Sequence, residues 1–198
     1  MRVLDRAIEK VVEHLRARLD AVQSSRRRSS PTTPALDWAG MDRIELVPMT
    51  AKQYEALMPE VIAGYAHENV VSGRWTEEES MHQSREQTER LLPQGLATPD
   101  HRLWTIARAG DHEPVGMLWI HVKQKPKPHA FIYYIEIYPQ FRRHGYAEQA
   151  MTQFEEEARR LGLESIRLDV FDHNAAARPL YAKLGYEATN ILMAKRLK

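Results

Sequence analysis

The run AFIYYIEIY, residues 130–138, limits the possible folds more than any other segment of the chain. Its residues are mostly aromatic or β-branched, which favours a strand. HRLWTIAR and PVGMLWIHV, residues 101–108 and 114–122, precede it as two more predicted strands joined by short turns, so all three should be antiparallel neighbours. A predicted helix over residues 145–161 and a strand over 165–171 follow. Because strand, helix and strand form a right-handed crossover, this last pair should be parallel.

The remaining predicted elements surround these strands. We expect a first strand over residues 42–49, a helix over residues 51–70, a helix that begins after Thr76 and stops at Pro93, a helix over residues 174–185 and a last strand over residues 188–197. The prediction is therefore an α/β (α+β) fold with a mixed, mostly antiparallel sheet of about six strands.

The first 40 residues form a separate part of the chain. Apolar residues recur every three or four positions over residues 1–22, which predicts a helix. QSSRRRSSPTTP, residues 23–34, is too polar to fold alone and is interpreted as a linker. We therefore predict an N-terminal helix and linker over residues 1–40 and a compact domain over residues 41–198. The helix is also typical of one that pairs with a second copy, which makes a homodimer one alternative.

Composition excludes several classes of site and partner. The chain has no cysteine, so disulfides, thiolate metal sites and a cysteine nucleophile are excluded. Its net charge of +1 gives no basic field for nucleic acid, and no apolar run approaches the ~20 residues of a membrane span. The histidines are scattered, so no metal site is predicted. We expect a cytoplasmic protein without a nucleic-acid or membrane partner.

The first chemical motif is Arg-x-x-Gly-x-Ala at residues 142–147, between a predicted strand and a predicted helix. The first amides of a helix have no intrahelical partner and lie at the positive end of its dipole, so they bind phosphate readily. Gly145 lacks a Cβ, which lets an anion approach the backbone. We interpret the motif as a pyrophosphate cradle; the alternative is a solvated basic loop.

The second motif runs from Asn174 through Tyr181 to Gly185 and Tyr186. Tyr181 lies seven residues after Asn174, about two turns along one helix face. Each residue also has a purely structural alternative: Asn174 as an N-cap, Tyr181 as a core aromatic and Gly185 as a C-cap.

Together, the two motifs and the order of elements resemble the GNAT superfamily of acetyl-CoA-dependent N-acetyltransferases over residues 42–197. The resemblance implies helices on both faces of the sheet, with strands 4 and 5 splayed apart around the pantetheine arm of acetyl-CoA. It also implies cofactor-binding roles, in the backbone or the side chain, for Ile137, Tyr138, Arg142, Arg143, His144, Gly145, Tyr146, Ala147 and Asn174. Tyr181 would point at the cofactor sulfur and act as the acid.

The base has two candidates. Glu136 and Asp169 each interrupt an apolar run in a predicted central strand, and buried carboxylates are often functional. The alternative is that they face water or pair with an arginine. Some members of the family place a base at the position of Asp169, and others use water alone.

The acceptor is the least constrained part of the prediction. In the family, the segment between strands 1 and 2 shapes the acceptor pocket, and here it holds Tyr65, His67, Glu68 and Trp75. Aromatic rings with a carboxylate suit a cationic amine. The resemblance thus implies acetyl transfer to a primary amine of a small molecule or protein, by direct attack in a ternary complex. The alternative function is a non-catalytic acyl-CoA-binding regulatory module.

Overall fold

The computed structural model describes residues 42–193 and residue 195. The predictions for the N-terminal helix, the linker and the domain boundary near Met41 lie outside these residues.

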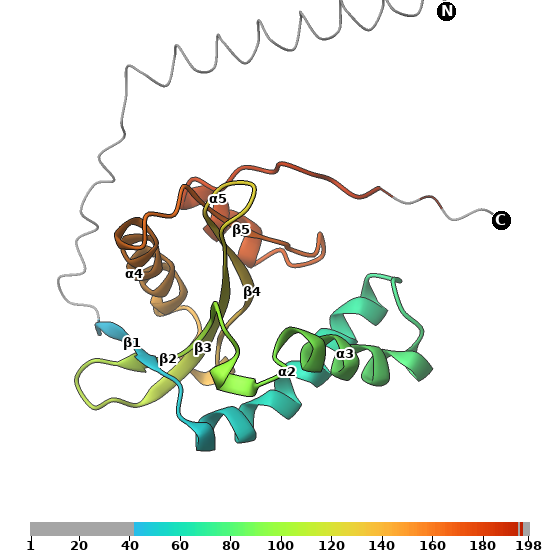
Figure 1. Ribbon diagram of the computed structural model, residues 1–198, viewed down its shortest axis with the longest axis horizontal. Helices are drawn as coiled ribbons and strands as arrows, with labels where there is room; N and C mark the ends of the chain where they lie inside the picture. Colours follow the sequence, from blue (N-terminus) through green and yellow to red (C-terminus); the bar gives the residue numbers. More distant parts are fainter. Residues whose placement is uncertain (1–41, 194, 196–198) are drawn as a thin grey trace, which may run out of the picture. The chain divides into compact units, whose positions relative to one another are not determined.

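The centre of the molecule is a single sheet of strands in the order β1-β2-β3-β4-β5. The strands are β1 (Ile44–Pro48), β2 (His101–Arg108), β3 (Pro114–Lys123), β4 (His129–Ile137) and β5 (Ser165–Leu168). The first three pairs are antiparallel and β4 pairs with β5 in parallel (Figure 1), which confirms the predicted directions.

Several helix ends lie at residues whose chemistry favours a helix boundary. They are α2 (Ala51–Val71), α3 (Glu77–Leu91), α4 (Tyr146–Arg160) and α5 (Ala177–Lys183), with short 3₁₀ turns η1 (Gly95–Ala97) and η2 (Pro139–Phe141). The Thr76 side chain accepts a hydrogen bond from the Glu79 amide and caps α3. Gly162 and Gly185, which follow α4 and α5, have φ angles of 70° and 82°, the left-handed conformation that ends a helix.

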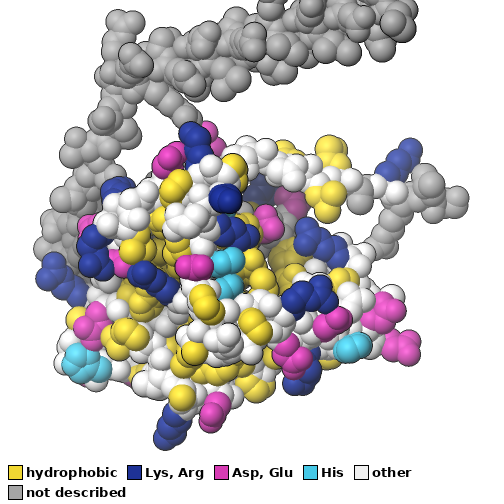
Figure 2. Space-filling view, in the orientation of Figure 1, with side chains coloured by type: hydrophobic (Ala, Val, Ile, Leu, Met, Phe, Trp, Pro, Cys, Tyr) yellow, Lys and Arg dark blue, Asp and Glu magenta, His cyan; other side chains and the backbone are white. Residues whose placement is uncertain are grey.

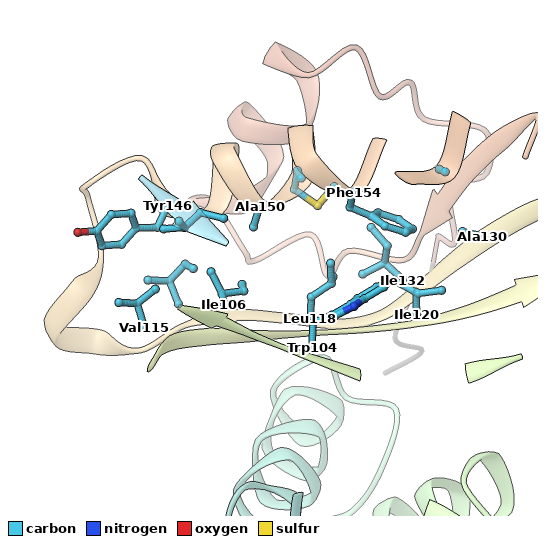
Figure 3. Close-up of a cluster of buried hydrophobic side chains, with 14 residues drawn as sticks. Trp104, Ile106, Val115, Leu118, Ile120, Ala130, Ile132, Tyr146, Ala150 and Phe154 are labelled. Carbon is cyan, nitrogen blue, oxygen red and sulfur yellow. The ribbon is translucent and has the colours of Figure 1, made fainter. Parts of the chain in front are cut away.

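Helices cover both faces of the sheet, as predicted. On one face, α4 buries Ala150, Met151 and Phe154 against the strands (Figure 3). The other face carries a second buried cluster, in which Met58 and Val61 of α2 take part. This arrangement leaves the ends of the strands between the two helical layers as the place for a site.

The last predicted strand is wrong over the residues that can be described. Residues 188–193 form no strand, and Ile191, Leu192 and Met193 are largely exposed. Within the described part of the chain the sheet therefore has five strands rather than about six. A strand needs a ladder partner, and the pattern of the segment alone does not supply one.

β4 and β5 separate soon after they begin. They pair only from His129 to Ile132 on β4 and from Ser165 to Leu168 on β5, so β5 ends three residues earlier than predicted. Among the described residues, no strand pairs with Tyr133–Ile137 on the β5 side. The predicted splay is thus confirmed. β4 also has a bulge, because Trp119 faces Tyr134 while Ile120 faces Ile132, which leaves Tyr133 as the extra residue.

Candidate active site

The open side of β4 presents free backbone groups. The Tyr138 amide donates to the Val115 carbonyl at 2.9 Å, so the backbone of Tyr138 faces β3. Backbone direction alternates along a strand, so Ile137 and Ile135 face the gap instead. Arg142 Nε confirms this direction for Ile137, because it donates to the Ile137 carbonyl at 2.9 Å. The gap can therefore pair with an extended ligand that carries amides.

The backbone contact predicted for Tyr138 needs a correction. Its carbonyl accepts the Phe141 amide at 2.9 Å, and its own amide is taken by β3. Both groups hold the turn η2 against the sheet, so the half-buried side chain of Tyr138 is what remains available to a ligand.

The backbone turns sharply between η2 and α4, and this turn exposes a series of amides. Arg143 and Gly145 have φ angles of 68° and 77°, and Gly145 is the N-cap of α4 without a side-chain cap. Within the described chain, no amide of residues 143–148 donates to a protein acceptor. The buried ring of Tyr146 anchors the turn, and its hydroxyl donates to Asp42 at 3.3 Å. These amides form a concave set of donors at the positive end of a helix.

The basic side chains around this turn divide into two groups. Arg142 folds back onto β4, where its Nη2 lies 3.1 Å from Glu136 Oε1. Its charge is therefore paired with a carboxylate at the end of the sheet. Arg143 and His144 are exposed. The His144 ring stacks on Tyr146 with centroids 5.6 Å apart. His144 Nδ1 also lies 3.2 Å from the Phe141 carbonyl oxygen, so Arg143 is the basic side chain of this turn that remains free to face an anion.

Glu136 lies on the α2 side of β4, with both carboxylate oxygens engaged. Tyr134 donates its hydroxyl to Oε2 at 2.8 Å, and Arg142 holds Oε1. Burial and the nearby charge of Glu136 raise the pKa of Tyr134, which keeps that phenol neutral. The structure therefore contains the alternative stated for Glu136, a carboxylate that is paired with an arginine.

Asp169 does not lie in a central strand. β5 is at the edge of the described sheet and ends at Leu168, so Asp169 follows it as an exposed residue. The prediction that Asp169 is a buried carboxylate in a central strand is therefore wrong, because the apolar residues before it form a short edge strand.

Asn174 and Tyr181 lie at the start and near the end of the last helical segment. Asn174 Oδ1 accepts the Ala177 amide at 3.1 Å, so its N-cap alternative is present. Tyr181 packs against the core beside α4, and burial raises its pKa. Its hydroxyl makes no hydrogen bond to another described residue. It is thus a neutral phenol with a free proton. The Tyr186 ring lies 5.7 Å from it.

The predicted acceptor residues are partly assembled at the end of α2. The rings of Tyr65 and Trp75 meet edge to face at 5.3 Å. Glu68 Oε2 lies 2.5 Å from Nε2 of His173, which follows β5. His173 was not among the residues predicted from the sequence. No sequence signal could have found it, because its partner lies 105 positions away in the chain. The acidic residues Glu77, Glu78 and Glu79 lie in the first turn of α3, where negative charge stabilises the helix dipole.

A groove among the described residues lies elsewhere. It has a volume of about 470 Å³ and is lined by β1, β2 and the C-terminal end of α4. Its charged residue Glu157 accepts hydrogen bonds from both Arg102 and Arg160. None of the predicted site residues lines it, so it is separate from the turn at the N-terminal end of α4.

Other classes of site find no support in the described chain. No group of three or more His, Cys, Asp or Glu side chains there is placed to hold a metal ion. No described helix is long and apolar enough to cross a membrane. Acidic and basic side chains are interspersed over the face in Figure 2, in line with the small net charge.

Comparisons with known proteins agree with this geometry. Residues 65–186 match the model of the Acetyltransferase (GNAT) family. The chain is 37% identical over 155 residues to "Uncharacterized N-acetyltransferase YycN" of Bacillus subtilis (strain 168), a match that covers 78% of this chain and 99% of that protein. It is 38% identical over 150 residues to "Uncharacterized N-acetyltransferase YdgE" of the same strain, covering 75% and 95%.

Solved structures give the same result for the fold. The crystal structure of the putative acetyltransferase YycN from Bacillus subtilis superposes with a TM-score of 0.75 at 36% identity, covering 78% of this chain and 99% of that one. A putative acetyl transferase from Pyrococcus furiosus has the same fold at 24% identity, with a TM-score of 0.56 and coverage of 78% and 100%.

Proposed function

The chain belongs to the acetyltransferase (GNAT) family, which transfers acyl groups from acyl-CoA, and we propose that it acetylates a primary amine of a small molecule or protein. The amine attacks the thioester directly while both substrates are bound. The observation that carries the proposal is the gap beside β4, which leads into the free amides of residues 143–148. Backbone groups for a pantetheine arm and donors for a pyrophosphate thus follow one another along the chain.

In this proposal the chain binds the donor mainly through its backbone. The amide and carbonyl of Ile135 and the amide of Ile137 pair with the pantetheine amides, and the amides of residues 143–147 hold the pyrophosphate. Arg143 and His144 add charge beside it, and Asn174 approaches from the start of α5. Arg142 has a positioning role, because it ties Glu136 and the Ile137 carbonyl to the turn.

The reaction requires removal of a proton from the amine, stabilisation of the negative charge on the thioester oxygen and protonation of the leaving thiolate. A free alkylamine has a pKa of about 10.4, so it must lose a proton before it attacks. A backbone amide on the open side of β4 stabilises the negative charge that develops on the thioester oxygen. Tyr181 then donates its proton to the leaving thiolate; burial raises its pKa, which keeps the hydroxyl protonated, and the hydroxyl has no hydrogen-bond partner among the described residues.

Titration with acetyl-CoA, followed by a free-thiol assay against a panel of amines and peptides, tests the function. We expect acetyl-CoA to bind, and thiol to be released with one class of acceptor. Binding without release for every acceptor would favour the non-catalytic regulatory module. Absence of binding would overturn the donor site itself.

Tyr181→Phe should lower kcat by roughly 100-fold, because it removes the proton of a general acid. The dissociation constant for acetyl-CoA should stay within about twofold, since the ring remains in place. Steady-state kinetics and calorimetry together measure both quantities. An equal loss of kcat and of affinity would contradict the acid role.

Tyr186→Phe is the matched control for this substitution. Its ring is the neighbour of Tyr181, and its buried hydroxyl has no partner among the described residues. Removing an unpartnered buried hydroxyl is close to neutral for stability. We therefore expect wild-type kcat, and a similar loss in both variants would mean that only packing had changed.

A further inference from the structure

We propose that His173 is the general base of the reaction and that Glu68 orients it. This inference rests on the proposed function, because it assigns the group that takes the proton from the acceptor amine. The observation behind it is the contact of 2.5 Å between His173 Nε2 and Glu68 Oε2, which joins the loop after β5 to helix α2.

The pair lies beside the gap between β4 and β5. His173 belongs to the loop that leaves β5 at the point where the two strands have separated. Glu68 is one helical turn after Gly64, about 6 Å along α2. At Gly64 the helix contacts a side chain of β4, since a Cβ there would lie 3.7 Å from the Tyr134 hydroxyl. Glu68, which contacts the imidazole, is thus one turn of α2 beyond the point where the helix touches a β4 side chain.

The loop that carries His173 is held from two directions. Its ring stacks on Phe171 with centroids 5.4 Å apart, and the Arg74 guanidinium lies 5.2 Å over the Phe171 ring. Arg74 is fixed in turn, because its amide donates to the carbonyl of Asn69 at 2.9 Å. Asn69 is buried. His173 is thus tied to the C-terminal end of α2 directly through Glu68 and indirectly through Phe171 and Arg74.

The contact selects the tautomer. A carboxylate only accepts hydrogen bonds, so Nε2 carries the proton and Nδ1 keeps the lone pair. Within the described residues Nδ1 has no hydrogen-bond partner, and His173 is partly open to solvent. The charged groups around the ring are Glu68, Arg74 and Asp172, of which Asp172 is paired with Arg178 at 2.6 Å. Glu68 is the nearest, since its Oε2 contacts the ring at Nε2.

In the proposed reaction the acceptor amine loses two protons, one to His173 and one to the leaving thiolate. The Nδ1 lone pair takes a proton from the ammonium group, which frees the nitrogen lone pair of the amine. That pair forms the C–N bond at the thioester carbonyl carbon, and the C–S bond breaks with its electrons leaving on sulfur. The second proton of the attacking nitrogen passes to the thiolate with the help of Tyr181. His173 releases its proton to water, so each turnover liberates one proton.

The other candidate bases are less suited. Both oxygens of Glu136 already accept hydrogen bonds, one of them from an arginine. Asp169 is exposed at the end of an edge strand, and no carboxylate or arginine of the described residues is paired with it. His173 combines a free lone pair with an orienting carboxylate, the arrangement typical of an activated base.

The test is the pH dependence of kcat/KM for His173→Gln. A histidine base changes its charge between about pH 5 and 8, so the wild type should lose activity on the acidic side. The variant should be about 100-fold slower at pH 8 and lose that acidic limb. Its dissociation constant for acetyl-CoA should stay unchanged, which also shows that the variant is folded. Glu68→Gln should cause a smaller loss, because the ring keeps its lone pair but loses the carboxylate that orients it.

His112→Gln is the matched control. His112 Nδ1 lies 2.5 Å from Glu45 Oε1, so it is another exposed histidine paired with a glutamate, but at the far side of the sheet. Its kcat/KM and pH profile should equal those of the wild type. A wild-type profile in His173→Gln would overturn the assignment of the base while leaving the acetyltransferase intact. A wild type that neither binds acetyl-CoA nor releases thiol would overturn the proposed function instead.

Discussion

Gly116→Ala should lower the free energy of unfolding by about 2–3 kcal/mol, a large effect for one added methyl group. Gly116 lies in β3 opposite Ile137, where a Cβ would be 2.1 Å from the backbone oxygen of Glu136. That oxygen belongs to the ladder and cannot rotate away, so the end of β4 must shift. The midpoint of denaturant unfolding measures the loss.

The same shift should reach the site. The displaced backbone includes Ile137, whose groups face the gap, and Tyr138, which holds the turn before the free amides. We therefore expect weaker binding of acetyl-CoA in Gly116→Ala as well as lower stability. Gly110→Ala is the control, because nothing lies within 4 Å of a Cβ there, and stability should change by less than about 0.5 kcal/mol. Equal stability of the two variants would contradict the close approach.

Local chemistry explains which parts of the structure the sequence predicted. The Thr76 cap, the left-handed glycines after α4 and α5 and the three antiparallel strands depend on residues close together in the chain. The turn before α4 was also predictable, since Arg-x-x-Gly-x-Ala places a glycine where the backbone must adopt a positive φ. The two motifs and the order of elements together carried the resemblance to the family, and the resemblance implied the splayed strands.

Contacts between distant segments explain what was missed. Whether residues 188–193 form a strand depends on a partner strand, and the bulge at Tyr133 depends on register with β3. The Arg142–Glu136 pair and the Glu68–His173 pair depend on which way each side chain turns after folding. The roles assigned to single charged residues were therefore the least predictable part of the site, whereas the sharp turn before α4 followed from its glycine.

Gly145→Val should weaken binding of acetyl-CoA by about 100-fold. A β-branched residue is strained at the φ of 77° that Gly145 adopts, so the turn must change its path. The free amides of residues 143–148 then no longer converge. Loss of two charge-assisted hydrogen bonds to the pyrophosphate at about 1.5 kcal/mol each gives this factor. Calorimetric titration measures it, and unchanged affinity would contradict the cradle.

Gly162→Val separates the cradle from backbone strain. Gly162 has a φ of 70° at the opposite end of the same helix, and nothing lies within 4 Å of a Cβ there. Both variants should therefore lose similar stability, but only Gly145→Val should lose affinity for acetyl-CoA. Acetyl-pantetheine as donor sharpens the comparison, because it lacks the pyrophosphate. Its kcat/KM should be nearly equal in the two variants, so that the difference between them resides in the phosphate contacts.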